Sequence, residues 1–192
     1  MASLVLAGDT SGSLTVSAPA VAGSNTQTLV ATTGTLAPIV SGTAVTASGT
    51  SVDFTSIPSW VKRITVMFTG VSTIGTSNLL VQLGAGSVTT SGYAGYIARQ
   101  ASASNAYLAY SSGFLILETT GATYTTVGHL TITNINSNTW VGSGLATNSA
   151  AVNNTNVTSG SIALGGTLDR VRFTTVNGTD TFDAGTINIL YE

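Results

Sequence analysis

The chain has 192 residues, of which only 6% are charged, and its formal net charge at pH 7 is −2. An average soluble domain is about 25% charged. The few Lys and Arg residues form no cluster for phosphate groups, so we expect no binding to nucleic acid. The absence of Cys excludes a disulfide-stapled scaffold. A free monomer with so few charges would be poorly solvated, which predicts that sister chains cover much of the surface.

The residue types favour strands along the whole chain. Thr occupies 34 positions, Ser 23 and Gly 22. Thr and Val fit a pleated surface, and Gly and Asn favour turns. One Lys and two Glu leave amphipathic helices without a polar face, so we predict an all-β protein. No apolar run approaches the roughly 20 residues that span a bilayer, and we expect neither membrane insertion nor a signal peptide in MASLVLAGDTSG.

The N-terminal part of the chain is unusually poor in charge, with no charged side chain in residues 10–52. Two short β-prone runs, Leu14–Ser17 and Gln27–Ala31, lie among Gly, Pro and Asn residues. They are too short to bury a core alone, and the alternative is a disordered low-complexity tail. Because their Leu and Val positions alternate with polar ones, we predict that residues 1–45 form a β module for attachment or trimerisation.

Residues 50–192 are predicted to form an antiparallel, jelly-roll-like β-sandwich. Ile64, Val66 and Phe68 alternate with Arg63, Thr65, Met67 and Thr69, as in a half-buried strand. Many short strands with no helical segment between them are typical of a sandwich. The Asn-rich stretch 147–160 is predicted to be a long exposed loop. Other strands are expected around Val52 and Phe54 and over Leu79–Leu83, Tyr93–Arg99, Gly113–Thr119, Gly128–Ile135, Thr139–Ala146, Gly160–Leu164, Asp169–Val176 and Thr186–Tyr191.

Three segments resemble fibre proteins of tailed bacteriophages. Residues 11–36, SGSLTVSAPAVAGSNTQTLVATTGTL, resemble a small module that recurs in phage fibres and other virion proteins. Residues 50–84, TSVDFTSIPSWVKRITVMFTGVSTIGTSNLLVQLG, resemble the opening of the C-terminal β-sandwich of tail-fibre-like proteins, and LDRVRFTTVNGTDTFDAGTINILYE resembles its last two strands. The resemblance to this virion fibre family implies a homotrimer with a C-terminal head domain, exposed on the phage particle.

Few residues could support catalysis. His129 is the only His, and a lone His on a strand is usually a surface or packing residue. Asp180 and Asp183 would face opposite sides of a strand, so we expect two solvated loop residues. There is no Cys nucleophile, no Gly-x-Ser-x-Gly elbow and no metal-ligand motif. The sequence therefore predicts a protein that is not an enzyme and needs no metal or cofactor.

The aromatic residues are the main candidates for recognition. Aromatic rings stack on sugars and also anchor protein interfaces. The alternative is that these side chains fill the sandwich or the axis of the trimer, while Trp60 is expected in the core. The candidate receptor or interface aromatics are Tyr93, Tyr96, Tyr107, Tyr110 and Trp140.

Most of the positive charge lies in two short basic pairs, each close in sequence to an acidic residue. We predict that these charges form ion pairs between neighbouring strands or subunits, which help fix register. The alternative is attachment to an acidic neighbour on the virion. The residues concerned are Asp53, Lys62, Arg63, Asp169, Arg170 and Arg172.

Two functions fit these features. The first is a trimeric tail fibre or receptor-binding protein on the virion surface, with a host surface glycan as candidate ligand. The alternative is a capsid decoration (cement) or head-fibre protein that is held by other virion proteins through its N-terminal segment. A glycan-degrading enzyme is disfavoured because the catalytic residues are missing.

Overall fold

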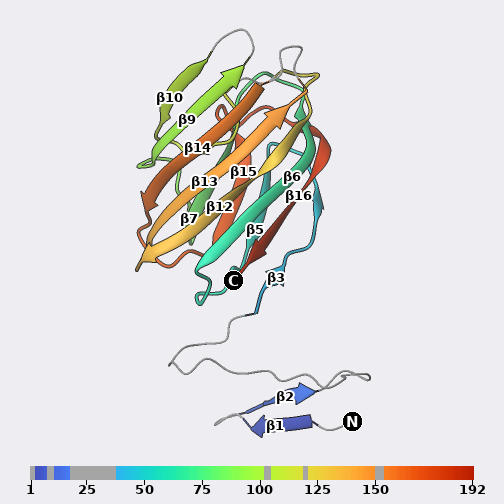
Figure 1. The fold of residues 1–192 in the computed structure, drawn as a ribbon, viewed down its shortest axis with the longest axis vertical. Helices are drawn as coiled ribbons and strands as arrows, with labels where there is room; N and C mark the ends of the chain where they lie inside the picture. Colours follow the sequence, from blue (N-terminus) through green and yellow to red (C-terminus); the bar gives the residue numbers. More distant parts are fainter. Residues whose placement is uncertain (1–2, 8–10, 18–37, 102–104, 119–120, 150–153) are drawn as a thin grey trace. The chain divides into compact units, whose positions relative to one another are not determined.

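A computed structural model describes residues 3–7, 11–17, 38–101, 105–118, 121–149 and 154–192. These residues form strands, turns and irregular segments and no helix, so the all-β prediction is confirmed for this part of the chain. The chain divides into two compact units, Met1–Leu36 and Ala37–Glu192. Figure 1 labels most of the strands of both units.

The N-terminal unit contains an antiparallel hairpin of β1 (Ser3–Ala7) and β2 (Ser13–Ser17). Between the strands, Gly12 adopts a φ of 81°, which a residue with a Cβ reaches only with strain. Val5 and Val16 are both 56% exposed, so the hairpin leaves apolar side chains open to solvent. The second predicted strand of this region, Gln27–Ala31, lies outside the described residues.

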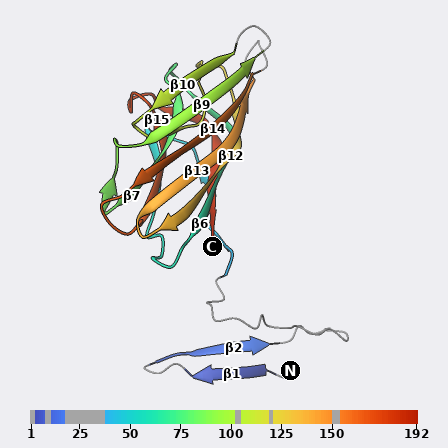
Figure 2. The same cartoon turned by 60° about the vertical axis from the view of Figure 1, so that its left-hand side comes forward.

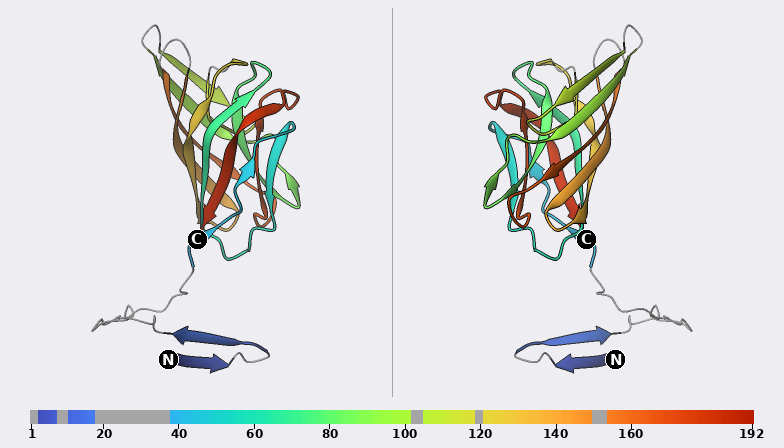
Figure 3. Two further views of the ribbon diagram at one scale, coloured as in Figure 1. Left: turned by 90° about the vertical axis from the view of Figure 1, so that its right-hand side faces the viewer. Right: turned by 90° about the vertical axis from the view of Figure 1, so that its left-hand side faces the viewer.

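The C-terminal unit is a sandwich of a nine-stranded and a five-stranded antiparallel sheet, which face each other in Figure 3. The larger sheet has the order β10-β9-β14-β13-β12-β6-β16-β3, and β4 also pairs with β16. Figure 2 shows its outer face over β9, β14, β13 and β12. Its strands are β3 (Val40–Ser41), β4 (Val45–Thr46), β6 (Arg63–Thr73), β9 (Ala94–Ala101), β10 (Ala106–Tyr110), β12 (Thr126–Asn136), β13 (Thr139–Asn148), β14 (Asn154–Ala163) and β16 (Phe182–Tyr191).

The smaller sheet has the order β11-β7-β15-β5, and β8 also pairs with β7. It packs an aromatic core against the larger sheet. Phe173 is fully buried, and its ring centroid lies 5.2 Å from that of Phe68 and 5.8 Å from that of Phe182. The strands are β5 (Ser51–Thr55), β7 (Leu79–Ala85), β8 (Ser87–Val88), β11 (Phe114–Leu115) and β15 (Arg170–Thr175).

Two boundaries differ from the sequence predictions. The C-terminal unit begins at Ala37 rather than at residue 50, because β3 and β4 pair with β16. The predicted exposed loop 147–160 is wrong for most of its length, because residues 154–160 belong to β14 and residues 147–148 to β13. Residues 150–153 lie outside the described part of the chain.

The loop prediction failed because three of its Asn residues, Asn148, Asn154 and Asn156, are buried in the sandwich. The Asn156 side chain accepts a hydrogen bond from the backbone N–H of Glu118 at 3.1 Å. The prediction for Trp60 is wrong in the opposite direction, because this residue is more exposed than expected. It was expected in the core, but it is 39% exposed and contacts the ring of Tyr191 at a centroid distance of 5.9 Å.

Candidate functional site

Two exposed tyrosines lie together on the outer face of the nine-stranded sheet. The antiparallel pairing of β9 with β10 sets Tyr107 opposite Ala98 and Ala109 opposite Tyr96. All four side chains point outward, since residues i and i+2 of a strand share a face and directly paired residues do so too. Tyr96 is 61% exposed and Tyr107 is 80% exposed. The pairing therefore places two aromatic rings on one diagonal and two small alanines on the other.

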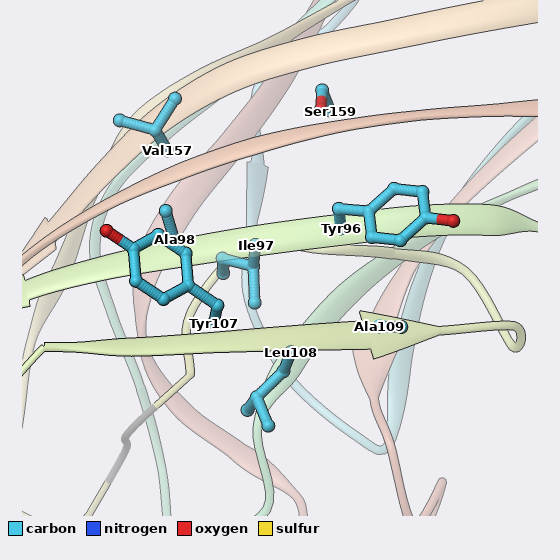
Figure 4. Close-up of a pocket in the computed structure, with 8 residues that line it drawn as sticks. All are labelled: Tyr96, Ile97, Ala98, Tyr107, Leu108, Ala109, Val157 and Ser159. Atoms are coloured by element: carbon cyan, nitrogen blue, oxygen red, sulfur yellow. The ribbon is translucent and has the colours of Figure 1, made fainter.

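This arrangement encloses a shallow hollow of about 420 Å³. Figure 4 shows the two tyrosines on neighbouring strands, with Val157 and Ser159 on the far side of β9. These two residues come from β14, where Val157 pairs with Ala98 and Ser159 with Tyr96. The hollow is lined by Tyr96, Ile97, Ala98, Tyr107, Leu108, Ala109, Val157 and Ser159. We refer to it below as the tyrosine hollow.

The inner face of the same two strands is anchored in a small hydrophobic cluster. Ile97 packs with Leu80 and Leu115, and Tyr110 lies partly buried against them. The side-chain amide of Asn78 donates a hydrogen bond to the Tyr110 hydroxyl at 3.5 Å. These contacts attach the inner face of β9 and β10 to the core, and so fix the backbone that carries the outward tyrosines.

The other candidate aromatics serve the interior. Tyr93 is buried, and its ring meets Phe114 edge-on at a centroid distance of 5.3 Å. Its hydroxyl accepts a hydrogen bond from the Leu83 N–H at 2.7 Å and lies 3.1 Å from the Thr89 carbonyl oxygen, to which it donates. Burial raises the pKa of Tyr93 to about 12. Trp140 is also buried. Of the five predicted aromatics, Tyr96 and Tyr107 are thus the two well-exposed ones, and Tyr110 is half-buried.

A row of glycines on the inner face explains how the sheet accommodates Phe114. Gly95, Gly160 and Gly142 pair in register across β9, β14 and β13. A Cβ at Gly142 or Gly160 would lie 3.1 or 3.3 Å from the Phe114 ring, and one at Gly95 would lie 3.0 Å from the Tyr110 carbonyl oxygen. The ring of the fully buried Phe114 therefore packs against the backbone of β13 and β14, where the glycines leave room for it. The signal in the sequence is a Gly at the inward position of three adjacent strands.

The predicted ionic residues lie away from the tyrosine hollow. Arg172 and Asp53 face each other across β15 and β5 and form a two-bonded pair with both distances 2.7 Å. Asp169 and Arg170 pair at 2.7 Å, and this contact with the guanidinium lowers the pKa of Asp169. These pairs join strands or neighbouring residues within one chain.

The other predicted basic pair, Lys62 and Arg63, lies where β6 begins, beside the C-terminal residue Glu192. Arg63 forms an ion pair with Glu192, a partner that the sequence analysis did not propose. Lys62 forms no ion pair with any residue that the structure describes, and its backbone N–H donates to the Glu192 carbonyl oxygen at 2.8 Å.

An interior ion pair that was not predicted from the sequence lies toward the C-terminal end of β9. Arg99 and Glu118 pair at 2.9 Å, and each side chain is only 17% exposed. Arg99 is on β9 of the larger sheet, whereas Glu118 follows β11 of the smaller sheet, so the pair links the two layers. The sequence carries a signal for this inward position of Arg99. Arg99 lies two residues after the apolar Ile97, and residues i and i+2 of a strand point to the same side.

The outer face around the hollow is uncharged. Arg99 is the single charged residue within β9, β10, β12, β13 and β14, and its side chain points inward to Glu118. The row that starts at Tyr107 continues through Ala98, Val157 and Leu145 to His129. His129 is exposed in this row, which continues through its pairing with Met67 on β6. On these five strands the outer face thus offers aromatic, aliphatic and hydroxyl groups and the His129 imidazole, without Asp, Glu, Lys or Arg side chains.

The acidic residues considered for catalysis have structural contacts. Asp180 accepts hydrogen bonds from the Asn177 side chain at 2.7 Å and from the Ser77 N–H at 2.8 Å, and these bonds lower its pKa. Asp183 accepts a hydrogen bond from the Ser72 hydroxyl. Within the described ranges, no three His, Asp or Glu side chains are placed to hold a metal ion. No helix in those ranges is long and apolar enough to cross a membrane.

Comparison of the chain with known proteins gives no match to a protein family, to a curated protein or to a solved structure.

Proposed function

We propose that this chain is a non-catalytic, fibre-like surface protein of a bacteriophage particle, and that it attaches to the host through the tyrosine hollow. The observation that carries the proposal is the pair Tyr96 and Tyr107, which stand 61% and 80% exposed around an uncharged hollow. Exposed aromatic rings on a rigid support are typical recognition groups, because they supply contact area at low entropic cost. The resemblance of residues 11–36, 50–84 and 168–192 to virion fibre proteins supports the same assignment.

The strand pairing supports a jelly-roll-like description of the head. In a jelly roll a long hairpin is rolled up, so that the first strand pairs with the last and the second with the last but one. Here β6 pairs with β16, β7 with β15, β9 with β14, and β12 with β13. The sandwich differs from a regular jelly roll in that β12 and β13 lie between β14 and β6 in one sheet.

A homotrimer is the assembly that we propose for this protein. Support comes from the low charge of the chain, because interface cores are depleted of charged residues. Three copies per trimer and many trimers per particle would convert weak single contacts into firm attachment by avidity. We expect light scattering after gel filtration to give about three times the chain mass of 19.2 kDa.

A second candidate is a capsid decoration or head-fibre protein. The N-terminal residues Met1–Leu36 form a compact unit of their own, which would suit a separate attachment to other virion proteins. In this reading the head domain projects from the capsid, and the tyrosine hollow remains a surface feature.

Cryo-electron microscopy of the intact particle tests the proposal. Density for this protein at the tail, with the head domain directed outward, is the result we expect. Density on the capsid lattice, held through the N-terminal unit, would favour decoration instead. Absence of this protein from the particle would contradict both candidates.

A further inference from the structure

We infer that the tyrosine hollow binds a neutral saccharide, one sugar ring of which stacks on Tyr96 or Tyr107 above the floor of Ala98 and Ala109. This inference rests on the proposed attachment role, because it names the chemical class of ligand at that same site. It is argued from the shape of the hollow, the chemistry of its rim and the absence of charge around it.

The shape suits a flat ring of moderate size. Diagonal neighbours on paired strands are about 7–8 Å apart, and Figure 4 shows the Tyr96 and Tyr107 rings turned in opposite directions, so that a single sugar ring can enter between them. The volume of about 420 Å³ lies in the lower part of the range for small-molecule sites. Larger residues at Ala98 or Ala109 would fill this gap, since both side chains point into the outer face between the tyrosines.

The rim carries the groups that sugars need. A pyranose has one face of C–H groups, which buries apolar area against an aromatic ring, and an edge of hydroxyls that seek hydrogen bonds. Tyr96 and Tyr107 supply the rings together with two phenolic hydroxyls, and Ser159 supplies a further hydroxyl beside Tyr96. The Ser143 side chain follows in the next strand, paired with Ser159.

The charge distribution selects a neutral sugar over an acidic one. An acidic sugar would call for Arg or Lys, but the charged side chain nearest in sequence, Arg99, points into the sandwich and pairs with Glu118. Acidic or basic peptides are disfavoured for the same reason. An apolar peptide would be expected to use the free edge of β10 and pockets for alternate side chains, whereas the hollow lies on the face of the sheet.

Binding of the full-length protein to an array of immobilised polysaccharides provides the test. The probes are dextran, mannan, galactan and chitin fragments as neutral glycans, with polygalacturonate as the acidic comparison. We expect binding to at least one neutral glycan and none to polygalacturonate. Tyr96→Ala and Tyr107→Ala should each weaken that binding about tenfold or more, while Tyr96→Phe, which keeps the ring, should stay within a few-fold.

Two controls separate saccharide binding from folding and from self-association. Val127→Ala removes an exposed apolar side chain from β12 on the same face and should leave glycan binding unchanged. The mass in solution and the melting temperature of each tyrosine variant should equal those of the parent. If Tyr96→Ala and Tyr107→Ala break the oligomer, the hollow is an interface with a second copy and the inference is overturned. Binding to no neutral glycan by an intact oligomer overturns it as well.

Host cells treated in two ways distinguish this inference from the proposed function. Periodate cleaves the vicinal diols of cell-surface sugars, whereas proteinase K removes surface proteins. We expect labelled protein to bind untreated and proteinase-treated cells and to lose binding after periodate. Tyrosine-dependent binding that only proteinase K removes would refute the saccharide and preserve the attachment role. Binding that does not depend on either tyrosine would refute the attachment role at this site.

Discussion

Truncation of Phe173 tests how the sandwich core is built. The side chain is fully buried and contacts Phe68 and Phe182, and its backbone pairs with Val52 on one side and Val81 on the other. Because β15 is held between β5 and β7, the surrounding strands cannot collapse into the space that a Phe173→Ala substitution leaves. We therefore expect a loss of about 3–5 kcal/mol in the free energy of unfolding, the range for Phe→Ala in a core.

Urea unfolding at fixed protein concentration measures this loss, since the stability of an oligomer depends on concentration. A unit of this size loses about 2–4 °C in melting temperature per kcal/mol, so the substitution should lower it by about 6–20 °C. Val176→Ala is the matched control, because Val176 is 41% exposed just beyond β15 and should change stability by less than about 0.5 kcal/mol. A loss below about 1 kcal/mol for Phe173→Ala, with an unchanged urea slope, would refute this assignment of the core.

Three further substitutions test local features. Gly142→Ala should cost about 1–3 kcal/mol because its Cβ would press on the Phe114 ring, whereas Gly165→Ala, with nothing within 4 Å, should be neutral in the same urea assay. Tyr93→Phe leaves the Leu83 N–H without its acceptor, at about 1–3 kcal/mol. Since burial raises the pKa of Tyr93 to about 12, its contribution to stability is full below about pH 10 and is lost as the pH rises through about 12. Unfolding of the parent measured between pH 10 and 12 should therefore show a loss of stability that Tyr93→Phe lacks. Arg172→Ala should cost about 0.2–1 kcal/mol, because its ion pair is solvent-exposed, and the cost should shrink in high salt; a larger, salt-independent cost would contradict a surface pair.

The fold class could be predicted because it depends on residue type. Alternation of Ile64, Val66 and Phe68 indicated the strand that became β6, and the scarcity of Lys and Glu argued against long amphipathic helices. The extent of β14 could not be predicted, because Asn154 and Asn156 are polar residues at inward positions. Their burial depends on partners such as the Glu118 backbone, which come from a distant part of the chain.

The tyrosine hollow was predictable only in part. Tyr93 and Tyr96 are three residues apart, as are Tyr107 and Tyr110, so on strands one member of each pair faces each side. The sequence could not show which side the second sheet would cover. That choice follows from the long-range pairing of β9 with β14 and from the packing of Ile97 on the smaller sheet.

Competition for phage adsorption tests the central claim most directly. Host cells are mixed with the phage in the presence of purified full-length protein, either the parent or the double variant Tyr96→Ala/Tyr107→Ala, after both have been shown to have the same mass in solution. The account predicts that the parent protein slows adsorption and that the double variant does not. Equal inhibition by both proteins, or inhibition by neither, would contradict attachment through the tyrosine hollow.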